Sequence, residues 1–226
     1  MIARLLIVAL LVAGCSSSAV KPSPAPTQVH GIVATPSSTN TALQMLANLP
    51  VKGRAPLTGY SRDQFAQAWT DDNDDALGHN GCDTRNDILK RDLTDVVFRS
   101  GSRCVVASGI LQDPYTGKTI HFVRGVTTST SVQIDHVVAL GDAWQKGAQQ
   151  LTAAQRVDLA NDPRELLAVD GPTNEAKGDG DAATWLPPNK AFRCTYVTKQ
   201  IEVSVAYHLW VTAAEKEAMQ RVLASC

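Results

Sequence analysis

Two short runs of apolar, largely β-branched residues organise the second half of the chain. They cover residues 132–138 and 166–169, and this length and composition predict buried strands. Asp135 and His136 interrupt the first run with a carboxylate and an imidazole. The second run leads through a Gly-Pro turn to Asn174 and a short polar segment that predicts the start of a helix. We therefore expect a strand with an acid and a base to meet a strand–turn–helix with an amide oxygen. These groups can converge on one divalent cation.

Capping residues and apolar periodicity predict several helices and an antiparallel hairpin or meander around these runs. Ser61 and Gln64 form one capping-box pattern, and Thr212 and Glu215 form another. The expected helices cover residues 41–49, 61–69, 84–91, 138–147, 152–159 and 189–209, with a last one after Thr212. The expected strands of the meander cover residues 96–98, 104–111 and 119–123. Together with the two central strands, these elements predict an α+β fold.

The first 14 residues have the features of a secretory signal. Arg4 precedes an apolar run at residues 5–12, which is too short to span a bilayer as a helix. The small residues before Cys15 resemble a bacterial lipobox, which implies cleavage after Gly14 and a lipid on Cys15. A plain signal peptide with an incidental cysteine is the alternative. Residues 15–40 are rich in Pro, Ser and Thr and predict a flexible tether.

From these segments we expect an exported protein with one globular domain at residues 41–226. The lipid would hold it on the outer face of a bacterial cytoplasmic membrane, unless it is shed or secreted. The membrane, through the lipid on Cys15, is then one partner, and nothing in the sequence indicates an obligate protein partner.

The composition excludes a strongly basic nucleic-acid-binding protein. The chain has 226 residues, of which 44% are hydrophobic, and a formal net charge of −1, so it can bury a core but has no basic field. A polyanion would have to bind at a local basic patch. The acidic run at residues 71–75 fails the calcium-loop pattern, because Ala76 and Cys82 stand where that loop needs Gly and Glu.

The cysteines agree with export. Besides Cys15 the chain has Cys82, Cys104, Cys194 and Cys226, an even number that suits disulfides in an oxidising compartment. Three pairings are possible, and we favour Cys82–Cys104 with Cys194–Cys226 because both close local loops. A zinc site is disfavoured, since the sequence has no Cys-x-x-Cys pair and its histidines are scattered.

The order strand, Asp-His, strand, turn, Asn, helix, Lys resembles the ββα-metal, or HNH, nuclease motif. More closely, the chain resembles a family of secreted bacterial HNH endonuclease-like proteins, of which it would be a lipoprotein member. Three elements carry this resemblance, which extends over residues 60–210: Gly-Cys-Asp-Thr-Arg at 81–85, Asp-His-Val-Val at 135–138, and Lys-Gly-Asp…Trp-Leu-Pro-Pro-Asn at 177–189. The resemblance implies a ββα-metal core within the α+β fold, stapled by disulfides.

The resemblance also implies roles for individual residues. His136 matches a general base that deprotonates water, and Asp135 and Asn174 match ligands of one Mg²⁺ or Mn²⁺ ion. Lys177 matches a basic catalytic residue one helical turn beyond the asparagine. Glu165 is a departure, because it stands where the superfamily usually has an asparagine. Its carboxylate could orient His136 through Nδ1, or could leave the catalytic groups wrongly arranged.

These groups suit the hydrolysis of a phosphodiester, which needs an attacking water, a base and stabilisation of the leaving oxygen. Basic residues that could hold the phosphate are Arg85, Lys190 and Arg193. The sequence therefore predicts a metal-dependent endonuclease acting on DNA, with RNA as an open alternative. Sequence preference should be small, because the chain has no reader module. Two rivals are a non-catalytic surface lipoprotein that binds nucleic acid or a cell-wall polymer, and a hydrolase of another phosphodiester.

Overall fold

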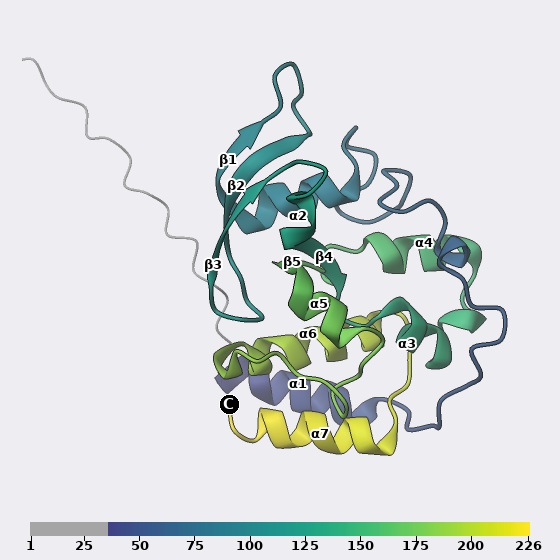
Figure 1. Cartoon of the computed structure of the whole chain (residues 1–226). Helices are drawn as coiled ribbons and strands as arrows, with labels where there is room; N and C mark the ends of the chain where they lie inside the picture. The colour runs from purple at the N-terminus through teal and green to yellow at the C-terminus, as the bar shows by residue number, and fades with distance from the viewer. Residues whose placement is uncertain (1–35) are drawn as a thin grey trace, which may run out of the picture. The chain divides into compact units, whose positions relative to one another are not determined.

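The computed structural model describes residues 36–226, so the expected signal peptide, Cys15 and most of the expected tether lie outside the described residues. Helices and two small antiparallel sheets make up an α+β fold, which confirms the α+β part of the predicted fold class, while the ββα-metal core stays a prediction (Figure 1). The helices are α1 (Pro36–Asn48), α2 (Thr84–Asp92), α3 (Leu140–Gln145), α4 (Ala153–Asn161), α5 (Gly171–Lys177), α6 (Arg193–Ala206) and α7 (Ala213–Leu223). The strands are β1 (Leu93–Phe98), β2 (Val106–Gln112), β3 (Thr119–Val123), β4 (Val132–His136) and β5 (Leu166–Asp170). Among the described helices, none has the length and apolar character that a membrane span requires.

The two antiparallel sheets are separate. Strands β1, β2 and β3 form an antiparallel meander, whereas β4 pairs with β5 alone. Asp135 lies opposite Leu167, and His136 lies opposite Leu166. Helix α2 packs against strands of both sheets and joins them (Figure 1). Helix α5 follows β5 without a break, so β4, β5 and α5 form a compact strand–strand–helix unit.

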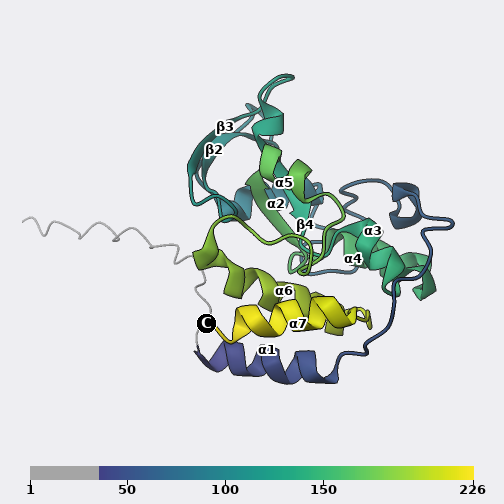
Figure 2. The same cartoon turned by 60° about the horizontal axis from the view of Figure 1, so that its bottom comes forward.

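The β4–β5 pair lies between two hydrophobic clusters. One cluster includes Ile134 and Leu166 together with side chains of α2 and the meander. The other includes Leu167 and Val169 together with side chains of α1, α6 and α7, which pack side by side (Figure 2). Because successive side chains of a strand point to opposite faces, both faces of this pair are buried. Both strands therefore read as near-continuous apolar runs in the sequence.

A group of charged side chains, all buried except Arg54, links α3 to α7. The ammonium of Lys146 lies 2.8 Å from Asp142, 2.5 Å from Glu215 and 3.4 Å from Asp181. Arg54 lies 2.6 Å from Asp142 and 2.7 Å from Asp181. Asp142 lies in α3, Lys146 directly after it and Glu215 in α7, so the group links elements that are distant in sequence. Its members pair with one another, and we assign the group a structural role.

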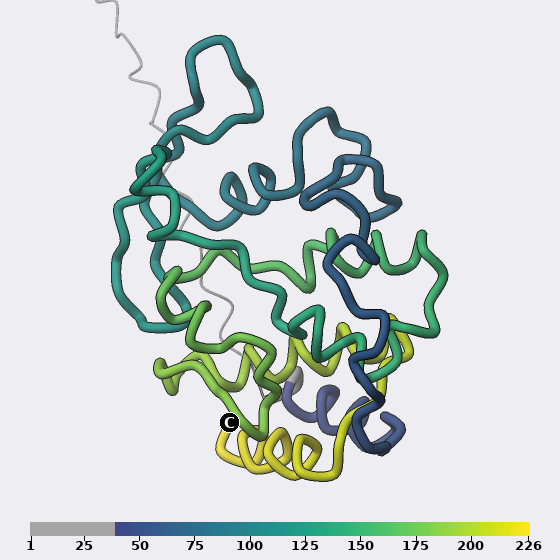
Figure 3. Tube along the Cα trace, turned by 45° about the vertical axis from the view of Figure 1, so that its right-hand side comes forward, coloured from purple at the N-terminus to yellow at the C-terminus, as the bar shows by residue number. Residues whose placement is uncertain are grey.

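The connection between α1 and α2 differs from the sequence expectation. Only the short 3₁₀ helix η1 (Arg62–Phe65) forms, and the side chain of Ser61 makes no capping hydrogen bond. Ala66 and Trp69 adopt positive φ angles of 63° and 62°, which end the helical path. The connection then runs past α3 and α4 towards α2 (Figure 3). Phe65 is buried as expected, but Trp69 is directed to the end of β4 instead of forming a shared helical face with it.

The N-terminal helix also begins earlier than expected. Helix α1 starts at Pro36, inside the segment 15–40 that the composition assigned to a tether. Proline is favoured in the first turn of a helix because its fixed φ suits that position and its missing N–H has no helical partner there. Helix α1 then packs against α6 and α7.

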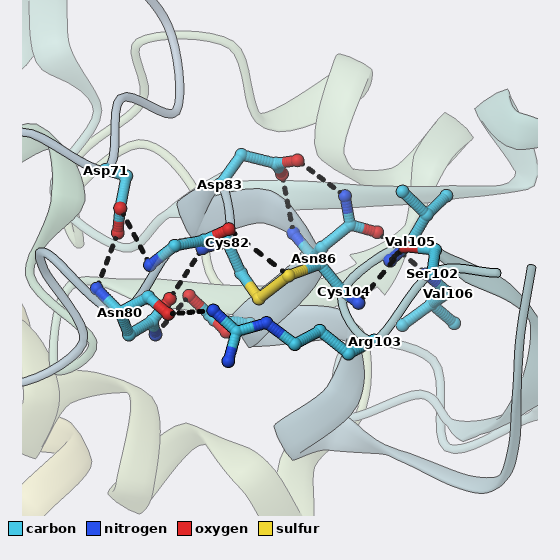
Figure 4. Close-up of a disulfide and its surroundings, with 12 residues drawn as sticks. Asp71, Asn80, Cys82, Asp83, Asn86, Ser102, Arg103, Cys104, Val105 and Val106 are labelled. Carbon is cyan, nitrogen blue, oxygen red and sulfur yellow. Dashed lines mark hydrogen bonds between the residues drawn. A yellow bond between two sulfur atoms is a disulfide. The ribbon is translucent and has the colours of Figure 1, made fainter.

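Both disulfides close local loops. Cys82 pairs with Cys104 and Cys194 with Cys226, at sequence separations of 22 and 32. The first bond joins the segment before α2 to the segment before β2, beside Asp83 and Asn86 (Figure 4). It therefore helps to hold the N-terminal end of α2 against the meander.

Candidate active site at the end of strand β4

His136 ends β4 in a buried environment. Its Nε2 lies 3.0 Å from the carbonyl oxygen of Ala160, and its ring stacks on Trp69 with centroids 5.5 Å apart and 12° between the planes. The pKa of His136 is lowered to about 3, chiefly by burial and also by the positive charges of Lys177 and Arg62, while the hydrogen bond to Ala160 opposes this shift. The imidazole is therefore neutral at neutral pH.

The hydrogen bond to Ala160 also fixes the tautomer of His136. A carbonyl oxygen can only accept, so Nε2 must carry the proton and Nδ1 must hold the lone pair. Within residues 36–226, Nδ1 has no hydrogen-bond partner. The ring thus presents one basic nitrogen, which is the state that a general base needs before it accepts a proton.

Asp135 faces away from His136, and both of its carboxylate oxygens accept hydrogen bonds. The ammonium of Lys177 lies 2.8 and 2.9 Å from its two carboxylate oxygens, and the hydroxyl of Tyr115 donates to Oδ2. Lys177 also donates to the carbonyl oxygen of His136 at 2.5 Å. All four residues are buried. The interaction therefore locks the end of β4 to the last turn of α5.

Asn174 lies on α5 and is held by a chain of side-chain amides. Its Nδ2 donates to Oε1 of Gln133 at 2.8 Å, and Nε2 of Gln133 donates to Glu175 at 2.8 Å. The helix is positioned by its N-cap Asp170, which accepts from Thr173 N, and by a proline in its first turn. Oδ1 of Asn174 is the amide oxygen left for a ligand.

The expected metal ligands share one cavity, but the donor set does not fit a divalent cation in this arrangement. Asp135, His136 and Asn174 all line a cavity of about 350 Å³. However, a cation at Asp135 would meet an ammonium that already bonds both carboxylate oxygens. In the part of the chain that the structure describes, no three His, Cys, Asp or Glu side chains are arranged to hold a metal ion. The structure thus places the Lys177 ammonium where the sequence expectation placed the metal ion.

Glu165 braces the turn after β4 and does not touch the His136 ring. Its carboxylate accepts from Val138 N at 3.1 and 3.2 Å, and its carbonyl accepts from Val137 N at 2.8 Å. It is fully buried, and this burial raises the pKa of Glu165 well above its ordinary value. The expected orientation of His136 through Nδ1 is not seen. Glu165 instead acts on the backbone immediately after the histidine.

The structure adds Arg62 and Trp69 to the site, where no sequence pattern placed them, and also brings in Asp179 of the Lys-Gly-Asp element. Arg62 lines the cavity of about 350 Å³ and also a second cavity of about 280 Å³, and both cavities include His136. Trp69 lines the second cavity and Asp179 the first. Arg62 and Trp69 precede β4 by more than 60 residues, and no local pattern connects them to it.

The three arginine and lysine residues expected to bind phosphate lie at different places. Lys190 and Arg193 lie in and directly after the 3₁₀ helix η4 (Lys190–Phe192), and neither lines a cavity at His136. Arg193 donates to the carbonyl oxygen of Pro187 at 2.8 Å and so supports the turn before it. Arg85 lies in the first turn of α2 and donates at 3.4 Å to the carbonyl oxygen of Val132, where β4 begins.

Comparison with known proteins identifies relatives of this chain. Residues 83–222 match the family of the C-terminal domain of GmrSD restriction endonucleases, and this match includes α2, both sheets and α5. An uncharacterized secreted protein of Arthroderma benhamiae is 39% identical over 207 residues, which cover 91% of this chain and 92% of the relative. No solved structure matches the chain. The secreted relative supports the predicted export, and because it is fungal the similarity is not restricted to bacteria. The lipid on Cys15 stays a prediction.

Proposed function

This chain belongs to the family of the C-terminal domain of GmrSD restriction endonucleases, and from this membership we infer that it is an exported nuclease that hydrolyses nucleic-acid phosphodiesters. The proposed catalytic mechanism rests on the protonation state, tautomer and position of the His136 ring. Its ring is neutral, its tautomer is set by Ala160, and it borders two cavities. We assign it the role of general base.

In the proposed reaction, Nδ1 of His136 accepts a proton from a water molecule as the water oxygen attacks phosphorus. The bond from phosphorus to the leaving sugar oxygen breaks, and that oxygen takes a proton from solvent. The hydrogen bond from Nε2 to Ala160 then stabilises the charged ring, because the carbonyl oxygen faces the positive imidazolium. Trp69 and the buried surroundings keep the ring in a fixed orientation. The low pKa favours a neutral ring at rest but makes it a weak base.

Cationic side chains stabilise the phosphate in this proposal. Arg62 is exposed and lines both cavities at His136. We assign it the role of binding the phosphate. A guanidinium suits the charge that develops on phosphate oxygens because it presents several donors in a plane. Lys177 does not contact the phosphate in this proposal. It neutralises Asp135 and fixes the carbonyl group of His136. Glu165 keeps the following turn in place.

We propose DNA as the main substrate, with RNA as a second, and low sequence preference, within a ββα-metal core formed by β4, β5 and α5. The Mg²⁺ or Mn²⁺ ion implied by the sequence resemblance stays a prediction, and no step above is assigned to it. One observation favours a second candidate function, a non-catalytic protein that binds nucleic acid. Lys177 already neutralises Asp135, which would leave the site without a free carboxylate at that position.

The experiment that tests the proposal compares cleavage of supercoiled plasmid, single-stranded DNA and RNA by the mature chain. Each substrate is tested with Mg²⁺, with Mn²⁺ and with chelator. His136→Ala should lose cleavage, and His121→Ala is the matched control because His121 is exposed on β3. Loss of cleavage in both variants, or in neither, would contradict the role of His136. Binding without cleavage under every condition would support the non-catalytic candidate.

A further inference from the structure

A second cationic site lies at the opposite end of β4. The guanidinium carbons of Arg85 and Arg124 both lie 6.0 Å from the ring centroid of Phe122. Phe122 is buried, while both arginines are half-buried. The two positive charges therefore converge on one aromatic ring at the surface of the domain.

These two arginines lack a counter-ion. Across residues 36–226 neither guanidinium has a carboxylate at ion-pair distance. The carboxylate that acts electrostatically on both is Asp83, and it already accepts two hydrogen bonds from Asn86. Arg99 adds a further positive charge near Arg124. The local charge is thus unbalanced, and an anion would balance it.

The position of Arg85 is unfavourable for the fold by itself. Burial and the nearby charge of Arg124 lower the pKa of Arg85. Arg85 also lies in the first turn of α2, where the helix dipole disfavours positive charge. Unfavourable features of this kind often mark functional positions, because binding of a ligand offsets them.

The donors of the site are held in place before any ligand arrives. Arg124 donates through Nε to Val106 O and through Nη2 to Asn86 Oδ1, both at 2.6 Å. Asn86 is fixed by Asp83 next to the disulfide of Cys82 (Figure 4). Within the described chain, Nη1 of Arg124 and Nε and Nη1 of Arg85 have no partner. Pre-ordered donors of this kind lower the entropic cost of binding an oxyanion.

The site also lies in line with the candidate active site. Arg85 bonds the carbonyl oxygen of Val132, the first residue of β4, and residues 133–136 of the same strand line the cavity at His136. Four residues of strand span about 13 Å at ~3.3 Å per residue. This span exceeds the ~3.4 Å axial spacing of neighbouring phosphates in one strand of duplex DNA, so the two sites would contact different phosphates of a strand.

We propose that Arg85 and Arg124 bind a backbone phosphate of a nucleic-acid strand, a few nucleotides away from the phosphodiester at His136. The placement relative to the cleaved bond rests on the proposed function. Binding of the polyanion itself does not, because it depends only on the two guanidiniums.

Binding is measured by fluorescence anisotropy with a labelled 30-base-pair DNA duplex, in chelator and in the His136→Ala background, so that cleavage does not interfere. Arg85→Gln and Arg124→Gln should each weaken binding by about tenfold. Each should also reduce the slope of log affinity against log salt by about one. Arg221→Gln, on the exposed face of α7, is the matched control and should change neither quantity.

Arg85→Gln is the decisive variant, because removal of an unpaired charge from a helix N-terminus should leave the thermal stability unchanged or raised. Unchanged affinity and salt slope in Arg85→Gln would overturn the proposal. A loss of binding accompanied by a lower melting temperature would also overturn it, because the loss would then reflect a destabilised fold. The turnover of bis(p-nitrophenyl) phosphate, which is too small to reach from His136 to Arg85, is measured in the background that keeps His136. This turnover should fall less in Arg85→Gln than the cleavage of DNA does, and a loss equal to that on DNA would place Arg85 in the cleavage site and overturn the assignment. A wild-type protein that binds the duplex but cleaves nothing would contradict the proposed function alone.

Discussion

The indole of Trp69 lies nearly parallel to the imidazole of His136, with 5.5 Å between ring centroids and 12° between planes. Trp69 reaches this position with a positive φ of 62°, a backbone conformation that disfavours a bulky side chain. The stack closes one side of the histidine and contributes to the burial that lowers its pKa. The cover over His136 is therefore formed by a locally strained segment.

Removal of the indole should restore an ordinary basicity to His136. In Trp69→Ala we expect the pKa of His136 to rise from about 3 towards 6.5, because water reaches the ring. Trp69→Phe keeps an aromatic ring at the same position and should keep the pKa low. A titration of the imidazole protons by NMR measures both values. If the pKa stays the same in the alanine variant, Trp69 does not control the burial of the ring.

The low pKa of His136 also predicts a pH dependence of stability. The unfolded chain binds a proton at His136 below about pH 6.5, whereas the folded chain binds it only near pH 3, so acidification within this window destabilises the fold. At ~1.4 kcal/mol per pH unit, the change from pH 6.5 to pH 5 removes about 2 kcal/mol. Glu215 and Asp75, whose pKa values are raised to about 7, act in the opposite direction.

The effect of His136 is therefore measured as a difference between two proteins. Urea unfolding of the wild type and of His136→Gln at pH 7 and pH 5 gives four free energies. The wild type should lose about 2 kcal/mol more than the variant over this range. Equal losses would show that the imidazole is not buried in its neutral form.

The ion pair of Lys177 with Asp135 should be important for stability. Lys177→Met leaves the buried Asp135 carboxylate without its cation, and we expect the free energy of unfolding to fall by about 3–5 kcal/mol. In Lys177→Met/Asp135→Asn the buried charge is gone, so most of this loss should be recovered. Urea unfolding of the two variants measures the difference. A loss below about 1 kcal/mol in Lys177→Met would indicate that water reaches the pair.

A divalent cation should compete with the Lys177 ammonium for Asp135. We expect calorimetry to show weak binding of Mn²⁺ to the wild type and binding at least about tenfold tighter in Lys177→Met, since the competing charge is absent. Asn174→Ala made in the Lys177→Met background should weaken the binding again. Tight binding to the wild type that Lys177→Met leaves unchanged would show that the cation does not use Asp135.

The sequence was informative where structure is set locally. The predicted capping box of Thr212 and Glu215 forms, although that of Ser61 and Gln64 does not, and the two apolar runs form the paired strands β4 and β5. In each case the signal lies within a few neighbouring residues. The same holds for Asp135 and His136, which adjoin each other on a strand and share one cavity with Asn174.

Contacts between distant residues were not predictable in this way. Lys177 bonds Asp135 across 42 residues, and the choice between a metal ion and an ammonium at that carboxylate depends on the packing of α5 against β4. The stack of Trp69 on His136 depends on two positive φ angles that residue types other than glycine rarely adopt. Neither feature leaves a local pattern, so both required the folded structure.

The most direct test of His136 as the general base is chemical rescue. His136→Gly removes the imidazole and leaves space, so cleavage of plasmid DNA should fall by about 10²–10⁴-fold. Added imidazole should restore part of the rate in this variant and should have no effect on the wild type. Full cleavage by His136→Gly without imidazole would contradict the proposed mechanism.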